Sequence, residues 1–581
     1  MLLQQAAAYA RTLSNQQPAG YQNKPIRYII DLDASGDRAH ITDVRPGPKS
    51  RGLELSVPHA KRSSGIRPIL FADYGTYTLG VPREKDAPER GPELLEAYRA
   101  LVERCAARTG SPDVGAIATF LRNLPGSMPK LPADFDPAAN ITFEVAGVRV
   151  IDLPEVQSFW ADELGLGAED EPAEGGFECI VCGNQRDAVR VHPLKIKGIL
   201  AGQSGGTDLI SANNDAYFSY GLENSLTAPT CASCAEMYAN GLNALLASAK
   251  THTRVAGVEY CCWVKSGKDT AVIPCLEDPE SEDAMWVIAS FTNGNTNALR
   301  EFKEEHFYAT SLSGNGARAV VLSWLDSTLL EAYEHIVKYF EAHSIVAPDG
   351  GAPTRYPLRR LANAMVRDPA KQQPPRGDIA AMMRFALAGS KLPLDLLNQA
   401  VIRCRAEQGV RRDRAALLKM VLVSRERFAE VGGLKEMLDP AITEPAYVYG
   451  RLFSVLNDIQ YAALGSVNAS VVDRFYGAAS ATPAAVFGLL IRNAQNHLKK
   501  MRRDKKELAA NALEARMEEL LGFIPSVAGK MKFEKTLGLE GQGVFALGFY
   551  HQRAYSRAQA KERAAARDAR GGTATAQSAV A

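Results

Sequence analysis

At 581 residues the chain is too long for one hydrophobic core, and we expect several domains. Its 46% hydrophobic and 23% charged residues are typical of a globular protein, and no apolar run approaches the about 18 residues of a membrane span. The formal net charge of +1 argues against a uniformly basic nucleic-acid-binding protein. Basic and acidic residues nevertheless gather in separate segments, which predicts local basic surfaces.

The cysteines and the amino terminus bear on the compartment. The segment MLLQQAAAYARTLSNQQ lacks the basic and apolar regions of a secretory signal. Nine cysteines are an odd number and include two CxxC pairs, which favours reduced thiols and a metal over a disulfide framework. We therefore expect a cytoplasmic protein with no membrane partner.

Short β-branched and aromatic runs separated by Gly and Pro predict strands in residues 24–155 and again in 257–330. Examples are IRYIIDL, VEYCCWV, MWVIASF and ARAVVLSWL. A helical segment, ELLEAYRALVERCAART, interrupts the first region. From about residue 329 amphipathic helical periodicity replaces the strands. The pattern predicts an α+β fold, in which a mixed strand-rich amino-terminal region with a zinc-knuckle insertion is followed by an α-helical bundle domain.

Changes in composition predict six consecutive parts of the chain. They are a mixed α/β region at 1–155, a cysteine block at 156–256, a strand-rich continuation at 257–330, a helical region at 331–440, a carboxy-terminal helical bundle at 441–553 and a disordered tail at 554–581.

Two CxxC pairs, CIVC and CASC, give the strongest chemical signal. Each pair brings two thiolates to one ion, and four thiolates complete the tetrahedral shell that Zn2+ accepts. The 48 residues between the pairs exceed the spacing of compact zinc ribbons, and pairs of buried thiols are the alternative. A catalytic deaminase zinc is not indicated, because no histidine is followed two positions later by glutamate. The sequence predicts a structural Zn2+ held by Cys179, Cys182, Cys231 and Cys234.

Between these pairs, RVHPLKIKGILAGQSGGT combines lysines with a glycine-rich turn. Backbone N–H groups and lysines at such a turn suit phosphate oxygens, although no Walker A sequence is present. A solvated loop is the alternative. His192 could be a further ligand or a proton donor, but a packed, hydrogen-bonded histidine is the commoner case. The candidates for DNA contact here are Lys195, Lys197, Gln203 and Ser204.

A second basic loop, KRSSGIRP, lies between two predicted strands. Gly65 permits a tight turn, and the cations and hydroxyls around it can reach phosphates or groove edges. An exposed hairpin with incidental charges is the alternative. The candidate DNA contacts are Lys61, Arg62, Ser63, Ser64 and Arg67.

A third basic segment, RNAQNHLKKMRRDKK, lies in the helical part. Helical spacing would place its polar residues on one stripe that can follow a single strand, and a solvated helix face is the alternative. The stripe consists of Arg492, Gln495, Lys499, Arg502 and Lys506. A second, weaker patch consists of Arg411, Arg412 and Arg414.

Signatures of catalysis are mostly absent: the sequence contains no HExxH or kinase motif. The best carboxylate cluster is DLD, with Asp31 and Asp33 at the end of a predicted strand. Acidic residues before Ser35-Gly36 more often form a turn than a two-metal site. We therefore expect no enzyme. The alternative is a zinc-containing, metal-dependent nuclease with Asp31 and Asp33 as metal ligands.

Segments along the whole chain resemble the large subunit of the type I-C CRISPR surveillance complex (Cascade), the Csd-one or Cas-eight-c family. The cysteine block carries CIVC, RVHPLKIKGILAG, LISANNDAYFSYG and TCASCAEMYANGLNALL. The other resembling segments are KPIRYIIDLDASG (24–36), RSSGIRPILFADYGTYTLG (62–80), ATSLSGNGARAVVLSWLDSTL (309–329), PAYVYGRLFSVLNDIQ (445–460) and FALGFYHQR (545–553).

The resemblance implies a non-catalytic subunit of a ribonucleoprotein in antiviral defence. Such a subunit contacts the 5′ end of the CRISPR RNA, reads the protospacer-adjacent motif (PAM) in double-stranded DNA, stabilises the R-loop and recruits a helicase-nuclease. Base pairing would supply the sequence specificity. The resemblance further implies that the amino-terminal domain, with the loop KRSSGIRP, reads the motif. Implied partners of the helical end are the displaced non-target strand and the small subunits, and the complex also holds backbone and guide-processing subunits.

Overall fold

The structure, a computed structural model, describes residues 1–581 apart from 14–16, 48, 63–64, 85, 88, 167–175, 432, 528 and 579–581, and apart from the side chains of 431, 527, 530 and 567–578. The chain divides into two compact units. Unit 1 comprises Met1–Ala247 and Leu312–Val321, and unit 2 comprises Ser248–Ser311 and Leu322–Ala581. Strand-rich sheets precede a long helical part, so the predicted α+β fold class is confirmed.

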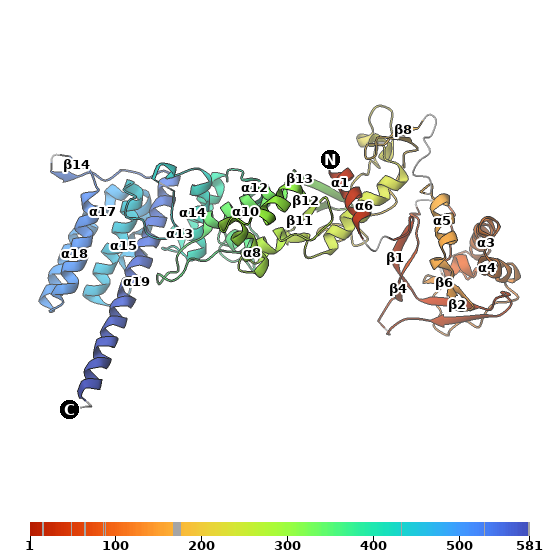
Figure 1. The fold of residues 1–581 in the computed structure, drawn as a ribbon, viewed down its shortest axis with the longest axis horizontal. Helices are drawn as coiled ribbons and strands as arrows, with labels where there is room; N and C mark the ends of the chain where they lie inside the picture. Colours follow the sequence, from red (N-terminus) through yellow and green to blue (C-terminus); the bar gives the residue numbers. More distant parts are fainter. Residues whose placement is uncertain are drawn as a thin grey trace. The chain divides into compact units, whose positions relative to one another are not determined.

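The first sheet of unit 1 is built around β2 (Tyr28–Leu32). This strand pairs antiparallel with β3 (Ala39–Asp43) and parallel with β6 (Asn140–Val145). Because parallel strands are covered on both faces, Ile29 and Ile30 are both buried although they point to opposite faces. Figure 1 shows helices beside this sheet. The further elements are β1 (Tyr21–Ile26), β4 (Leu53–Pro58), β5 (Asp73–Tyr74), α2 (Gly75–Thr78), α3 (Arg90–Thr109), α4 (Pro112–Asn123), β7 (Val148–Arg149), η1 (Val150–Asp152) and α5 (Pro154–Glu163).

The rest of unit 1 contains α1 (Leu2–Thr12), which packs against α6 (Ala232–Ala247). The two helices approach closely at Gly241, where an added Cβ would lie less than 3.0 Å from the carbonyl of Ala6. Short elements around the cysteine block complete this part. They are β8 (Phe177–Glu178), β9 (Gln185–Arg186), η2 (Asp215–Tyr217) and η3 (Asn224–Thr227).

A second sheet has the strand order β10-β11-β12-β13. Every residue of β11, the run VEYCCWV, is buried, as expected for an inner strand. The run MWVIASF, predicted as a strand, lies instead in α8 (Glu282–Thr292), so that prediction was wrong. The side chain of Ser281 caps this helix by accepting from the Ala284 N–H. The elements here are β10 (His252–Val255), β11 (Val258–Val264), α7 (Val272–Glu277), α8, α9 (Thr296–Glu304), β12 (His306–Asn315) and β13 (Arg318–Thr328).

Helices make up the remainder of unit 2. They share one continuous hydrophobic core, which includes residues from α10 to α19. Helix α19 continues to Ser578, through most of the stretch for which the sequence predicted disorder, in a segment rich in helix-favouring Ala and Arg. The elements are α10 (Leu329–His343), α11 (Leu358–Asn363), α12 (Arg376–Ala388), α13 (Leu394–Ala406), α14 (Arg412–Ser424), η4 (Ala429–Val431), α15 (Pro445–Leu464), α16 (Val471–Ala481), α17 (Pro483–Arg503), α18 (Glu507–Gly522), β14 (Ser526–Val527), β15 (Lys530–Met531) and α19 (Leu539–Ser578).

Helices α15 and α19 form the closest helix pair of the bundle. An added Cβ on Gly450 of α15 would lie less than 3.0 Å from the Phe545 carbonyl, and one on Gly548 of α19 would lie as close to the Tyr447 carbonyl. Glycine on both helices therefore permits backbone-to-backbone contact. Among the described residues, none of the helices combines the length and the apolar composition of a membrane span.

We expect Gly548→Ala to destabilise unit 2 by about 1–3 kcal/mol, because the new methyl group must displace the backbone of α15. Gly488→Ala is the matched control: it lies within α17, faces open space, and should raise stability by up to about 1 kcal/mol. Urea unfolding of both variants measures the difference. Equal effects at the two sites would show that α15 and α19 do not meet at Gly548.

Candidate functional site

The two CxxC pairs lie on different local structures. Cys179 and Cys182 occupy the turn between β8 and β9, where the Cys179 N–H donates to the Asn184 carbonyl (2.9 Å) and the Gly183 N–H donates to the Cys179 carbonyl (2.8 Å). These bonds curl the chain around the first pair. Cys231 directly precedes α6, and Cys234 lies in the first turn of that helix.

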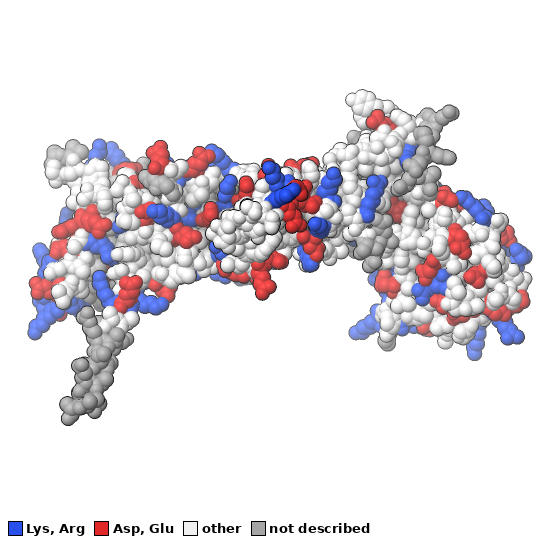
Figure 2. All heavy atoms as spheres, viewed as in Figure 1, with Lys and Arg blue, Asp and Glu red and all other residues white. Residues whose placement is uncertain are grey.

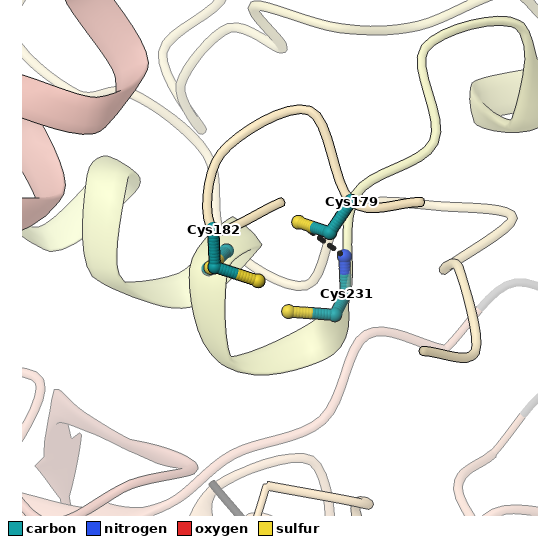
Figure 3. Close-up of side chains that lie close together, drawn as sticks. Cys179, Cys182 and Cys231 are labelled. Atoms are coloured by element: carbon teal, nitrogen blue, oxygen red, sulfur yellow. Dashed lines mark hydrogen bonds between the residues drawn. The ribbon is translucent and has the colours of Figure 1, made fainter. Parts of the chain in front are cut away.

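The four cysteines converge on one point. Their Sγ atoms all lie within 4.8 Å of one another, and Figure 3 shows three of them pointing into a shared space. A tetrahedral Zn2+ with bonds of about 2.3 Å requires sulfur atoms about 3.8 Å apart, so the observed spacing fits. The Cys231 N–H also donates to the Cys179 Sγ (3.4 Å). Only Cys182 is exposed. The geometry can accept a structural zinc ion.

Electrostatics point the same way. Hydrogen bonds from the thiols of Cys231 and Cys234 lower the pKa of Cys179, and the same interactions raise the pKa of both donors. Thiolates this close repel each other, so all four can ionise only around a cation. The amino-terminal end of α6 adds a favourable dipole for negative sulfur. Among the described residues, these cysteines are the one group of three or more metal-ligating residue types close enough to hold an ion.

His192 is not part of this group. Its Nδ1 lies 2.6 Å from the hydroxyl of Tyr238 on α6, and the ring is buried. Burial lowers the pKa of His192 to about 4, so the ring is neutral at pH 7. His192 is therefore a packed, hydrogen-bonded histidine, which is the commoner case for a lone histidine.

Helix α6 also holds the lysine segment that follows the first cysteine pair. The Asn243 Oδ1 accepts from the Lys197 N–H (2.7 Å), and the Asn243 Nδ2 donates to the Lys195 carbonyl (3.0 Å). Two turns earlier, Glu236 accepts from the Gly20 N–H (2.8 Å). The helix that begins at the cysteines therefore positions both the lysine segment and the chain before β1.

The two predicted basic loops, about 140 residues apart in sequence, lie side by side in unit 1. Lys61 Nζ forms an ion pair with Asp208 (3.2 Å), directly after the glycine-rich turn. Arg67 is exposed and has no ion pair with any described residue. Ser63 and Ser64, also predicted contacts, lie outside the described residues.

The glycine-rich turn is anchored by its backbone. The Gln203 N–H donates to the Gly316 carbonyl (3.1 Å), and the Thr207 N–H donates to the Ile196 carbonyl (2.8 Å). These N–H groups are therefore occupied within the protein and do not form a phosphate cradle. The side chains of Gln203 and Ser204 are exposed, so the turn offers side chains rather than backbone amides to a ligand.

Arg62 is held inside the protein rather than offered to a ligand. Its guanidinium forms an ion pair with Asp73, which is only 1% exposed, and lies 4.2 Å from the centre of the Tyr77 ring. Its Nε donates to the Arg67 carbonyl (2.8 Å). Because a buried carboxylate needs a paired cation, Arg62 is a structural residue that shapes the loop. Its sequence-based assignment as a DNA contact has no support in this geometry.

The structure adds basic residues that the sequence reasoning missed. A cavity of about 630 Å³ is lined by Lys61 and Arg67 of the basic loop and by Arg190 of the cysteine block. The pKa of Lys24 on β1 is lowered to about 8, mainly by burial. The positive charges of Arg62 and Lys197 also lower this pKa, whereas the carboxylate of Asp73 raises it. Neither Lys24 nor Arg190 belongs to a basic cluster that the sequence singles out, and only the fold brings them to the loops.

The predicted stripe in the helical part is only partly formed. Helix α17 ends at Arg503, because Lys505 adopts a left-handed conformation (φ 59°) and α18 begins at Glu507. Lys506 lies past this end and donates to the Ala462 carbonyl (3.0 Å). Placing Lys506 on the helical stripe was therefore wrong.

Of the residues that remain on the stripe, Arg502 forms an ion pair with Glu514 of α18. Arg492 and Lys499 are exposed and have no ion pair with any described residue, and Gln495 lies between them, half-buried. On the face of the molecule drawn in Figure 2, basic and acidic side chains are interspersed. The open stripe is thus Arg492, Gln495 and Lys499.

The weaker patch predicted at residues 411–414 is structural. Arg414 is fully buried and pairs with Glu407 (2.8 Å). Arg412 donates to the carbonyls of Ile345 (2.9 Å) and Ala352 (2.8 Å). Only Arg411 is largely exposed, and it pairs with Asp413. The geometry gives no support to these residues as a DNA-binding patch, because all three interact with acceptors of the protein itself.

The carboxylates of the predicted alternative are also engaged locally. Asp33 accepts from the Ser35 hydroxyl (3.0 Å) and the Asp37 N–H (3.0 Å) in the turn after β2. Asp31 accepts from the Thr42 hydroxyl (3.3 Å) on the neighbouring strand β3. The two side chains therefore form a turn and a cross-strand contact, and the geometry does not favour a two-metal centre.

Comparison with known proteins assigns this arrangement to a family. The family of the CRISPR-associated protein (Cas_Csd1) matches residues 4–556, nearly the whole chain. The chain therefore belongs to this family, whose members are large subunits of the type I-C Cascade complex. The resemblance found in the sequence is thus confirmed. No curated protein matched the chain.

We expect the purified chain to carry about one Zn2+ per molecule, because four converging thiols bind this ion tightly and couple it to folding. Cys231→Ser should lose the zinc and lower the unfolding temperature, whereas Cys105→Ala, which removes a buried thiol outside the group, should keep the zinc. Elemental analysis with thermal unfolding measures both. A zinc-free protein purified without chelators would contradict the metal site.

A second expectation separates Arg62 from its neighbours. Arg62→Ala should destabilise unit 1 by about 3 kcal/mol, because the buried carboxylate of Asp73 loses its cation. Arg38→Ala, at an exposed turn, should change stability by less than about 0.5 kcal/mol. Urea unfolding distinguishes the two variants. If the Arg62→Ala protein were as stable as the Arg38→Ala protein, Arg62 would not stabilise Asp73, and the solvated-loop interpretation would hold.

Proposed function

We propose that the chain is the non-catalytic large subunit of a type I-C CRISPR RNA-guided surveillance complex that reads the PAM in double-stranded DNA. It contacts the 5′ end of the CRISPR RNA, stabilises the R-loop and recruits the helicase-nuclease in antiviral defence. The observation that carries this proposal is the family match over residues 4–556. In this proposal, base pairing with the guide supplies specificity, and the protein supplies motif sensing and strand stabilisation.

The motif-sensing surface is best supported around the 630 Å³ cavity of unit 1. Arg67 is exposed at its wall, Lys61 is positioned by Asp208, and Lys197 is positioned through its backbone by α6. Exposed cations on rigid supports suit phosphate and groove contacts, because little conformational freedom is lost on binding. Lys195, Gln203 and Ser204 extend the same surface through the glycine-rich turn.

The cysteine site supports this surface mechanically. A zinc ion at Cys179, Cys182, Cys231 and Cys234 would fix the start of α6, and α6 then holds the lysine segment and the chain before β1. Zinc in this proposal is structural, because four thiolates leave no open position for water.

The open stripe of unit 2 supports contact with the displaced non-target strand. Arg492 and Lys499 lie two turns apart on one face of α17 and are not neutralised by described residues. Cations at this spacing can follow a single strand electrostatically. Other partners of the proposal are the backbone, guide-processing and small subunits of the complex, in the cytoplasm.

Replacing Arg67 and Lys197 together by Ala should weaken binding of the assembled complex to motif-bearing duplex about 10-fold and reduce the slope of its salt dependence by about 2. Arg38→Ala is the matched exposed control and should bind normally. Assembly with CRISPR RNA should be unchanged. Unaltered affinity and unaltered discrimination between flanking sequences would contradict the motif-sensing role of this surface.

A further inference from the structure

The resembling segments PAYVYGRLFSVLNDIQ and FALGFYHQR form the α15–α19 pair, which the proposed function leaves without a role. Beyond the glycine contact, polar residues of the two helices face each other in a buried seam. In unit 2, α15 packs against both α18 and α19, and Figure 1 shows it between them. The seam residues are Arg451, Ser454, Asn457, His551 and Gln552, of which all but Asn457 are almost fully buried.

Arg451 is the charged residue of this seam. Its side chain is 3% exposed, its Nε donates to the Gln552 Oε1 (3.2 Å), and its Nη2 lies 3.6 Å from Glu519 of α18. Its Nη1 has no hydrogen-bond partner among the described residues, and neither has the adjacent Gln552 Nε2. A buried donor without a partner is costly, above all on a charged group. Arg451 is therefore a buried cation whose hydrogen-bonding capacity the described residues do not fully satisfy.

Three more arginines surround the outer end of the seam. Arg516 of α18 lies 4.9 Å from the centre of the Tyr555 ring, and Arg553 and Arg557 lie one turn apart on α19. Arg516, Arg553 and Arg557 all interact electrostatically with Asp458 of α15. The arginine cluster thus consists of Arg451, Arg516, Arg553 and Arg557. It runs from a buried guanidinium, Arg451, to an exposed one, Arg557.

The cluster holds more cation than its carboxylates neutralise. Arg516, Arg553 and Arg557 all face the single carboxylate of Asp458, which balances only one of their three charges. Glu519 is half-exposed, where ion pairs are screened by water. Asp473, the second carboxylate near Arg553, also accepts from Ser470 in the cap of α16. The guanidinium groups therefore remain available for an anion.

We propose that the arginine cluster binds a phosphate group of a nucleic-acid strand. Planar guanidinium forks match phosphate oxygens in bidentate geometry. Arg516 and Arg557 receive the phosphate at the surface, and the buried Arg451 beneath them adds its positive charge to the site. That the phosphate belongs to a strand rests on the proposed function, whereas phosphate recognition itself rests on the cluster alone.

The test uses the full chain and two readouts. Fluorescence anisotropy measures binding of labelled single-stranded DNA and of RNA with the same sequence, and thermal unfolding measures stabilisation by inorganic phosphate against chloride of equal ionic strength. Arg516→Ala with Arg557→Ala removes the surface cations and spares the buried Arg451. The matched control is Arg300→Ala, an exposed arginine on α9 that also lies near a carboxylate, Glu304.

We expect the Arg516/Arg557 variant to bind at least one of the two strands about 10-fold more weakly and to lose the phosphate-dependent rise in unfolding temperature, while Arg300→Ala keeps both. Phosphate stabilisation without strand binding would leave the phosphate site standing and overturn only its assignment to a strand. Identical behaviour of both variants would overturn the site and leave buried water as the partner of Arg451. PAM discrimination by the assembled complex is measured separately. A failure of the proposed function can therefore be told apart from a failure of the phosphate site.

Discussion

Unit 1 depends on one electrostatic constraint: four thiols meet at the amino-terminal end of α6, and thiolates this close need a cation. A bound ion would fix the start of the helix, and side chains further along the helix contact two other segments. Glu236 holds the chain before β1, and Asn243 holds the lysine segment. The lysine segment is therefore placed by a helix whose start carries two of the four cysteines.

Formal charge alone is a poor guide to which cations meet a ligand. Arg62, Arg414 and Arg502 each form an ion pair with a carboxylate of the protein, which neutralises their charge. Arg67 and Lys499 have no such partner among the described residues and remain available. Arg451 differs from these arginines, because it is buried and its Nη1 has no hydrogen-bond partner among the described residues. The candidate contacts with nucleic acid are thus the cations that have no carboxylate partner among the described residues.

The sequence predicts what is local and misses what is tertiary. The CxxC spacing predicted the cysteine group because two residues between ligands fix their geometry within one turn. The alternation of strands and helices predicted the fold class, but the apolar run MWVIASF is helical, since Ser281 caps it and periodicity alone does not separate short buried elements. The end of α17 depends on a left-handed Lys505, and the pairing of Arg62 with Asp73 depends on the packed loop, neither of which the sequence pattern reveals.

The central claim is that this subunit reads the sequence flanking the target. The most direct measurement is selection of bound duplexes from a library with a fixed guide-complementary target and randomised flanks, using complexes assembled with and without the chain. The account predicts enrichment of a short flanking motif only when the chain is present, and its loss when Arg67 and Lys197 are replaced. The same enrichment without the chain, or none with it, would contradict the account.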